Sequence, residues 1–122
     1  MQYAVIVYET ESELNRRHDP EQIGPYMAPY AAYWEALAEA GVAAGGSGLE
    51  HPDTATTIRV RGGERVIEDG PFADTKERLG GFFLIECDTE EEAIQWAAKC
   101  PSVETGSVEL RPVMPDPEPA EA

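Results

Sequence analysis

The chain has 122 residues, of which 24 are acidic and 9 are basic, so its formal net charge is −15. A chain of this length predicts one domain with a substantial core, and the acidic excess argues against binding to nucleic acid or to an anionic membrane, which both need a basic patch. The sequence has no apolar run long enough to span a bilayer and no basic-then-apolar leader at Met1, so we expect a cytoplasmic protein.

The first predicted element is a strand over Gln2 to Glu9, with the sequence QYAVIVYE. Apolar residues occupy both of its faces, which is typical of a central strand covered on both sides. One face carries Tyr3, Val5 and Val7, and the other carries Ala4, Ile6 and Tyr8. The polar segment TESELNRRH that follows is predicted to be a connection.

A long helix is predicted next, with Asp19 as its N-cap, Pro20 at its first position and Gln22 at its third. It runs to Ala40 and ends at Gly41, a residue that favours helix termination. Because a proline cannot donate a backbone hydrogen bond, we expect a kink or a fresh start at Pro29. Its apolar stripe contains Ile23, Tyr26, Met27, Tyr30, Trp34 and Leu37.

The next segment, VAAGGSGLEHPDTA, opens with a short strand and continues as a loop. Thr56 to Asp69 then alternates as two runs joined by Gly62 and Gly63, which predicts a β-hairpin. A strict two-residue turn would place Ile58 opposite Ile67, whereas a bulge near the turn would shift the register. The register therefore stays open at this point.

The segment DGPFADTKERLG, from Asp69 to Gly80, is the most distinctive run in the chain. We interpret it as a tight turn, an aromatic anchor and one capped helical turn. Asp69 and Gly70 suit the turn, and Phe72 is expected to plug into the core. The helical turn would use Asp74 as N-cap, Glu77 at the third position, Leu79 pointing inward and Gly80 after its end.

The remaining elements are a strand, a helix, a strand and a tail. GGFFLIEC is apolar on both faces, with Phe83 and Ile85 on one and Phe82 and Leu84 on the other. DTEEEAIQWAAKC predicts a helix capped by Thr89 with Glu92 at its third position and stopped by Pro101. In SVELRPVM, Val108 and Leu110 should point inward. Residues 115–122 form an acidic, proline-rich tail with little to bury, which predicts disorder.

The two cysteines are predicted to be unpaired. Cys87 ends the strand and Cys100 ends the helix, so roughly 15–18 Å of helix would separate them at about 1.5 Å per residue. A disulfide needs Cα atoms closer than about 7 Å. We therefore expect two buried free thiols.

This order of elements favours an α+β fold, a ferredoxin-like sandwich with an antiparallel sheet, two helices on one face and an extra β-hairpin. In that fold the first and third main strands are central, and they are the two runs that are apolar on both faces. Two helices cover only one face of the sheet. The open apolar face therefore predicts a homodimer packed sheet to sheet.

The run DGPFADTKERLGGFFLIE resembles the signature of the DGPF branch of the YCII-related family. The segments LAEAGV, GSGLE, AIQWAAKCP and VELRPVM also fit, so the resemblance covers residues 1–114. It implies a dimeric α/β barrel of two ferredoxin-like sheets. Relatives with a proposed catalytic histidine carry it at a position that falls near Tyr30 here, so a histidine mechanism does not transfer. Some members are encoded beside sigma factors of the extracytoplasmic-function class.

Asp69 is the candidate catalytic acid, because it ends a strand where a loop can face a cleft; the alternative is a turn-forming Asp bonded to its own backbone. The candidate ligand-binding residues have structural alternatives too. The aromatic ones would be core residues, and the arginines would pair with acids on solvated strands. These candidates are Tyr8, Tyr30, Trp34, Arg59, Phe72 and Arg111.

No cofactor is expected. His51 and Asp53 are two potential metal ligands on one loop, and the sequence offers no third ligand beside them. The glycine motifs that bind phosphates or dinucleotides are absent from the sequence. Two functions remain open. One is a dimeric domain that binds a small organic molecule between sheet and helix, with acid–base chemistry of the lyase or isomerase type. The other is a non-catalytic ligand sensor or accessory protein.

Overall fold

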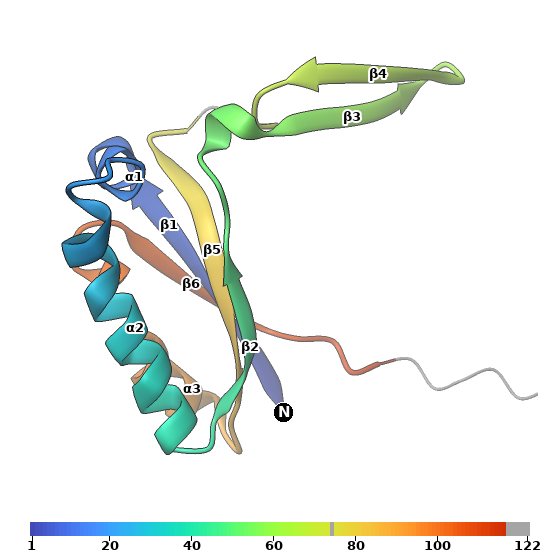
Figure 1. Cartoon of the computed structure of the whole chain (residues 1–122). Helices are drawn as coiled ribbons and strands as arrows, with labels where there is room; N and C mark the ends of the chain where they lie inside the picture. Colours follow the sequence, from blue (N-terminus) through green and yellow to red (C-terminus); the bar gives the residue numbers. More distant parts are fainter. Residues whose placement is uncertain (74, 117–122) are drawn as a thin grey trace, which may run out of the picture.

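The computed structural model describes residues 1–73 and 75–116 (Figure 1). The elements with helical backbone are α1 (Glu11–Arg17), α2 (Ile23–Glu39), the 3-10 turn η1 (Pro52–Thr54), α3 (Glu90–Ala97) and the 3-10 turn η2 (Pro101–Val103). The strands are β1 (Gln2–Thr10), β2 (Ala43–Gly48), β3 (Thr56–Arg61), β4 (Glu64–Asp69), β5 (Glu77–Glu86) and β6 (Ser107–Pro112).

Four strands form one antiparallel sheet in the order β2-β5-β1-β6, while β3 and β4 form a separate two-stranded hairpin. The central strands are therefore β1 and β5, as their two-faced apolar patterns predict. Val5 faces Phe83 and Ile6 faces Phe82 across this central pair. The ferredoxin-like prediction is confirmed in its strand order and its antiparallel pairing.

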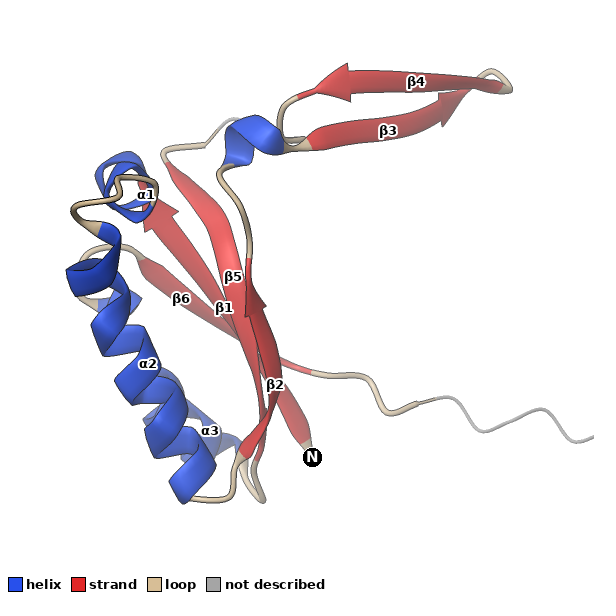
Figure 2. Cartoon of the chain, in the orientation of Figure 1, coloured by secondary structure: helices blue, strands red, loops and turns tan. Residues whose placement is uncertain are grey.

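The helices α2 and α3 lie on one face of the sheet, and no helix formed by residues 1–73 or 75–116 lies on the other face (Figures 1 and 2). The core lies between these layers. Val5, Leu37, Ile85 and Ala93 are fully buried in it, and Val108 and Leu110 of β6 pack against it. Both cysteines are free and buried, as predicted. Burial raises the pKa of the Cys100 thiol, as expected for a packing residue.

The predicted polar connection after the first strand is wrong, because residues 11–17 form α1. Thr10 and Glu13 make a reciprocal capping box there. The start of the long helix also differs. Gln22, not Asp19, is the N-cap of α2, and the Asp19 carboxylate accepts hydrogen bonds from the Glu21 backbone N–H and the Gln22 side chain.

The helix α2 continues through Pro29 without a fresh start. Its buried face contains Tyr26, Tyr30, Tyr33 and Leu37, and Gly41 follows its end with φ of 75°. Ile23, placed in the apolar stripe by its spacing, is exposed. It lies in the first turn, beyond the part of the helix that faces the sheet.

The hairpin β3-β4 has the strict two-residue register, with Ile58 opposite Ile67 and no bulge. Gly62 and Gly63 both have positive φ, as this turn requires. The short strand predicted after the first helix is confirmed as β2. The second helix is also confirmed, because the Thr89 side chain accepts the Glu92 backbone N–H.

The interpretation of residues 71–80 needs correction. Phe72 is 78% exposed instead of plugging into the core, and Leu79 is exposed as well. Glu77 and Gly80 belong to β5, not to a helical turn, because β1 extends to Thr10 and pairs with this segment. Residue 74, the proposed N-cap, lies outside the described residues, as do residues 117–122 of the predicted tail.

Candidate functional site

A cavity of about 320 Å³ lies between α2 and the β2-β5 edge of the sheet. Its helix wall is formed by Met27, Tyr30, Ala31 and Trp34. The sheet wall and the polar end of the cavity contain Val7, Glu9, Arg17, Gly46, Ser47, Gly48, Gly80, Gly81, Phe82 and Phe83. The Trp34 and Phe83 rings stack at 6.2 Å between centroids, so part of the wall is flat and aromatic.

Glycines in the sheet wall of this cavity let its two strands approach each other closely. A Cβ on Gly46 would lie 2.7 Å from the Phe82 carbonyl oxygen, and one on Gly81 would lie 2.6 Å from the Ser47 carbonyl oxygen. Both residues also have φ values that side chains disfavour. The GGSG and GG runs therefore let β2 and β5 pair closely.

The polar end of the cavity is a buried ion pair. Glu9 is only 2% exposed, and its Oε1 accepts a hydrogen bond of 2.5 Å from Arg17 Nη1. The same Nη1 donates to the Gly80 carbonyl at 3.0 Å, and Nη2 donates to the Leu49 carbonyl. Arg17 thus ties α1 to β1, to β5 and to the segment that follows β2, and it neutralises a carboxylate that would otherwise be costly to bury.

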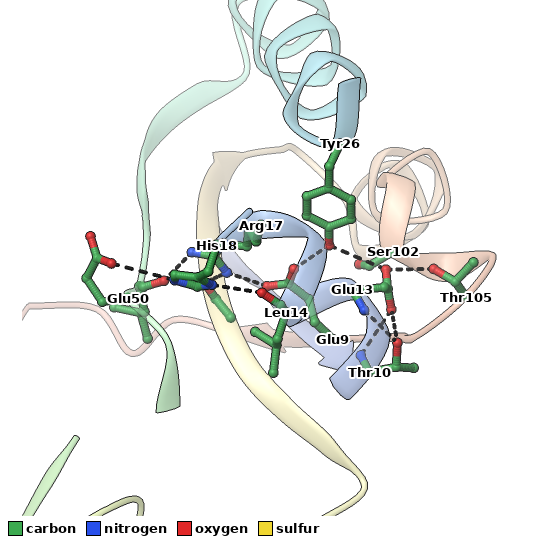
Figure 3. A network of polar contacts seen from close by, with 12 residues as sticks. Glu9, Thr10, Glu13, Leu14, Arg17, His18, Tyr26, Glu50, Ser102 and Thr105 are labelled. Atoms are coloured by element: carbon green, nitrogen blue, oxygen red, sulfur yellow. Dashed lines mark hydrogen bonds and ion pairs between the residues drawn. The ribbon is translucent and has the colours of Figure 1, made fainter. Parts of the chain in front are cut away.

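A chain of hydrogen bonds continues from this ion pair (Figure 3). The Tyr26 hydroxyl donates to Glu9 Oε2 and lies 3.4 Å from Glu13 Oε2. Glu13 also accepts from the Thr10 backbone N–H at 3.0 Å and from the Thr105 hydroxyl at 2.7 Å. Burial and the hydrogen bond to Glu9 raise the pKa of Tyr26, so its phenol stays neutral.

Tyr30 forms the wall behind the ion pair. Its hydroxyl is buried and has no hydrogen-bond partner of good geometry among residues 1–73 and 75–116. Burial raises its pKa to about 12, against lowering effects of Tyr26 and Ser102. The Tyr33 hydroxyl, one helical turn further on, donates to the Trp96 carbonyl at 2.9 Å.

The family model of the YCII-related domain matches residues 1–116 of the chain. The chain belongs to the YCII-related family. Among curated proteins it is 36% identical over 115 residues to the uncharacterised protein R00369 of Rhizobium meliloti strain 1021, covering 93% of this chain and 92% of that one. The resemblance drawn from the DGPF signature is confirmed at the level of the family.

Among solved structures, this YCII-related chain is similar to the 5-chloro-2-hydroxyhydroquinone dehydrochlorinase TftG of Burkholderia phenoliruptrix AC1100, in complex with 2,5-dihydroxybenzoquinone. The TM-score is 0.52, the identity is 17%, and the match covers 93% of this chain and 94% of that one. At this identity the likeness shows a shared fold.

The structure distributes the predicted site residues over four places. Tyr30 and Trp34 line the cavity. Arg59 and Phe72 contact each other at 5.0 Å in a cation–π pair. Asp69 ends β4, outside the cavity.

Tyr8 and Arg111 lie on the sheet face that carries no helix. The Tyr8 hydroxyl donates to Glu109 at 3.2 Å, and Arg111 pairs with Ala4 across the sheet. Desolvation and Glu109 raise the pKa of Tyr8. These two residues are therefore separated from Tyr30 and Trp34 by the sheet itself.

Sequence reasoning missed Glu9 and Arg17, the charged residues of the cavity. The signal that was available is the alternation of β1, which puts Glu9 on the same inward face as Val5 and Val7. An acid on the inward face of a central strand needs a buried partner. The partner, Arg17, was missed because residues 11–17 were predicted to be a polar connection and not a helix.

The described residues contain no group of three or more His, Cys, Asp or Glu side chains that could hold a metal. His51 Nδ1 lies 3.5 Å from Asp53 and accepts its backbone N–H, which caps η1. Within residues 1–73 and 75–116, no helix is both long enough and apolar enough to cross a membrane.

Proposed function

We propose that the cavity binds a small planar organic molecule that carries oxygen substituents. The observation that supports this is a buried Glu9–Arg17 pair at the end of an aromatic-lined cavity of about 320 Å³. That volume is at the lower end of the range for small-molecule sites. An apolar cavity with a few converging polar groups is the usual form of such a site.

The hydrogen-bonding capacity of the pair suggests what the ligand carries. Within the described part of the chain, Arg17 uses three of its five N–H groups, on Glu9, Gly80 and Leu49. The two that remain suit a carbonyl, phenolate or carboxylate oxygen. Each Glu9 oxygen keeps a lone pair and suits a ligand hydroxyl. A ring or quinone that carries both a hydroxyl and a carbonyl or phenolate oxygen satisfies both groups.

We further propose that Glu9 is the acid–base group of any reaction at this site. It lines the cavity, whereas Asp69 does not. The similar structure of TftG, a dehydrochlorinase, holds 2,5-dihydroxybenzoquinone. That ligand has the flat shape and adjacent oxygen substituents argued above. It supports proton transfer on a hydroxylated ring as the reaction class, of the lyase or isomerase type.

The binding test uses isothermal titration with 2,5-dihydroxybenzoquinone and a panel of hydroxylated aromatic acids. Ala31 lines the cavity, and Ala32, the next residue of α2, lines the opposite groove. Ala31→Leu should fill part of the cavity and weaken binding by at least about tenfold, because the ligand loses its space. Ala32→Leu is the matched control. Equal binding by both variants, or no binding across the panel, contradicts the proposal.

A non-catalytic ligand sensor is the second candidate, and one observation favours it. Both Glu9 oxygens already accept hydrogen bonds, from Arg17 and from Tyr26, so the carboxylate has structural partners before any ligand binds. Glu9→Gln separates the two functions. An enzyme should bind its substrate and lose turnover in this variant. A sensor should show binding without turnover already in the wild-type protein.

We also propose that the chain forms a homodimer through the sheet face that carries no helix. Ile6, Phe82 and Leu84 lie half-buried on that face, in register across the two central strands. Apolar patches of this kind usually mark interfaces. Light scattering should give twice the 13.3 kDa chain mass, and Phe82→Glu should dissociate the dimer because it would bury a charge. A wild-type monomer would contradict the proposal.

A further inference from the structure

The strand β3 has its polar face covered and its apolar face exposed. Thr57 and Arg59 are half-buried, whereas Ile58 is 63% exposed and Val60 is 62% exposed. Residues two apart lie on the same face of a strand, so Thr57 and Arg59 share the covered face. An arginine at such a position needs a physical reason, because burying a charged group is costly unless the group is paired.

The segment that follows β4 covers this polar face. The Thr57 hydroxyl donates to the Gly70 carbonyl at 2.8 Å, and the Gly70 backbone N–H donates to the Ala55 carbonyl at 2.7 Å. Two residues further on, the Phe72 ring lies 5.0 Å from the Arg59 guanidinium. A cation–π contact of this kind uses none of the N–H groups of the guanidinium. Phe72 therefore holds Arg59 in place and leaves its hydrogen-bonding capacity unused.

Arg59 has no anionic partner in the described part of the chain. No carboxylate there lies within ion-pair distance of its guanidinium, and its buried Nε has no hydrogen-bond acceptor. Its neighbour across the hairpin is Val66. Arg17, in contrast, is paired with Glu9. A buried polar group without a partner calls for an explanation, and a bound ion or ligand is one that fits a cation.

Arg59 lines a hollow of about 1050 Å³ at the base of the hairpin. Three arginines and two acids are among the described residues that line it, in a chain whose net charge is −15. One of the acids, Glu77, has both carboxylate oxygens 2.9 Å from the Ser107 hydroxyl. The other, Glu50, lies 3.6 Å from His18 Nε2. Both acids thus have neighbours outside the lining of the hollow, and Arg59 has none.

The lining also indicates the chemistry of the missing anion. The terminal nitrogens of a guanidinium bind the two oxygens of a carboxylate side by side. Phosphate offers a similar geometry. The apolar side chains of Tyr8, Phe72 and Leu79 also line the hollow, and they favour a ligand with an organic body. The strongly acidic chain opposes further negative charges on the ligand, which favours a single carboxylate.

We propose that this hollow is a second ligand site, in which Arg59 binds the carboxylate of a small organic acid and Phe72 contacts the organic body. The anion supplies the partner that the guanidinium lacks. No described residue lines both this hollow and the cavity of Glu9 and Arg17. The second site is therefore independent of the function proposed for the cavity.

The first experiment is an NMR titration of the isotope-labelled full chain with sodium benzoate, with sodium chloride at the same concentration as reference. Saturable shifts are expected for the backbone amides of residues 57–59 and 70–72. Arg59→Gln should raise the Kd at least about tenfold, because a neutral amide replaces the bidentate cation. Acetate, which has no ring to contact Phe72, should also bind at least about tenfold more weakly than benzoate.

The matched control is Arg65→Gln. Arg65 belongs to β4 of the same hairpin and does not line the hollow, so this variant removes the same charge from a neighbouring position. It should leave the Kd for benzoate unchanged within about twofold. Ala31→Leu fills part of the cavity and should leave the shifts at the hairpin intact. This variant distinguishes a failure of the cavity function from a failure of the second site.

Thermal unfolding without ligand separates ligand binding from a structural role of Arg59. Arg59→Gln should lower the Tm by no more than about 3 °C, because it removes an unpaired N–H and loses only a weak contact with an exposed ring. A larger drop would identify a structural arginine and overturn the proposal. Shifts that do not saturate, or that chloride reproduces, would show an adventitious ion only and overturn it as well. So would tighter binding of phosphate than of benzoate, or equal effects of Arg59→Gln and Arg65→Gln.

Discussion

The carboxylate of Glu9 occupies the space that a side chain on residue 80 would need. A Cβ built on Gly80 would lie 1.6 Å from Glu9 Oε1 and 3.0 Å from Arg17 Nη1. The φ of Gly80 is not positive, so backbone conformation does not require a glycine there. A glycine is needed there because the buried Glu9–Arg17 pair lies very close to β5. Through this contact the DGPF-containing segment, which ends at Gly80, forms part of the cavity wall.

Gly80→Ala should therefore destabilise the protein by about 1–3 kcal/mol, because the methyl group displaces Glu9 and leaves buried polar groups unpaired. Urea unfolding measures the change. Gly24→Ala is the control, since a Cβ at Gly24 in the first turn of α2 meets nothing within 4 Å. It should be neutral or stabilising by about 0.5–1 kcal/mol. Equal effects at both positions would disprove this explanation.

Arg17→Met should cost about 3–5 kcal/mol of unfolding free energy, because Glu9 would remain as an uncompensated buried charge. The double variant with Glu9→Gln should cost much less than the sum of the two single changes, with a coupling of at least about 1 kcal/mol. A double-mutant cycle in urea measures this coupling. Strict additivity would show that the pair is not a single energetic unit.

Tyr30→Phe and Tyr33→Phe remove the same atom from neighbouring turns of α2 with different expected results. The Tyr30 hydroxyl has no well-aligned partner in the described part of the chain, so its loss should be neutral or stabilising. The Tyr33 hydroxyl donates to the Trp96 carbonyl, so its loss should cost about 1 kcal/mol. Thermal or urea unfolding measures the stability of the two variants. A larger loss of stability for Tyr30→Phe than for Tyr33→Phe would contradict the prediction.

Stability should fall at alkaline pH. Burial raises the pKa of Tyr30 to about 12, from 10 for an ordinary tyrosine, and raises those of Tyr26 and Tyr33 as well. Between pH 10 and 12 the unfolded chain loses the Tyr30 proton while the folded chain keeps it, so this contribution is complete below pH 10 and declines above it. Each such group steepens the fall by up to about 1.4 kcal/mol per pH unit.

The measurement is urea unfolding between pH 8 and pH 11, with tyrosinate absorbance followed in parallel. Tyr30→Phe should give a shallower decline than the wild-type chain above pH 10, because one titrating group is gone. Stability that is independent of pH up to 11 would contradict the assignment of a buried neutral phenol.

The parts of the site that could be predicted from the sequence are those whose residues lie within one helix or strand. Helical spacing puts Tyr30 and Trp34 on adjacent turns of one helix, which fits core packing as well as a sheet–helix pocket. Strand alternation predicts that the Glu9 side chain points inward, but no residue of the same strand pairs with it. Arg17 reaches it only because Thr10 and Glu13 cap a short helix that turns the chain back. That capping box was present in the sequence and was masked by the polarity of the segment.

The sequence by itself indicated the family, because the run DGPFADTKERLGGFFLIE resembles that family's signature. The two-faced apolar patterns of residues 2–9 and 80–87 indicated the central position of β1 and β5. Only the tertiary structure decided that residues 77–80 are strand, since their pairing with β1 overrides a local capping pattern. It also decided that Gly80 must lack a side chain and that Ile58 and Ile67 of the β3-β4 hairpin are exposed. These features depend on contacts, or missing contacts, between segments far apart in the chain, which no local pattern encodes.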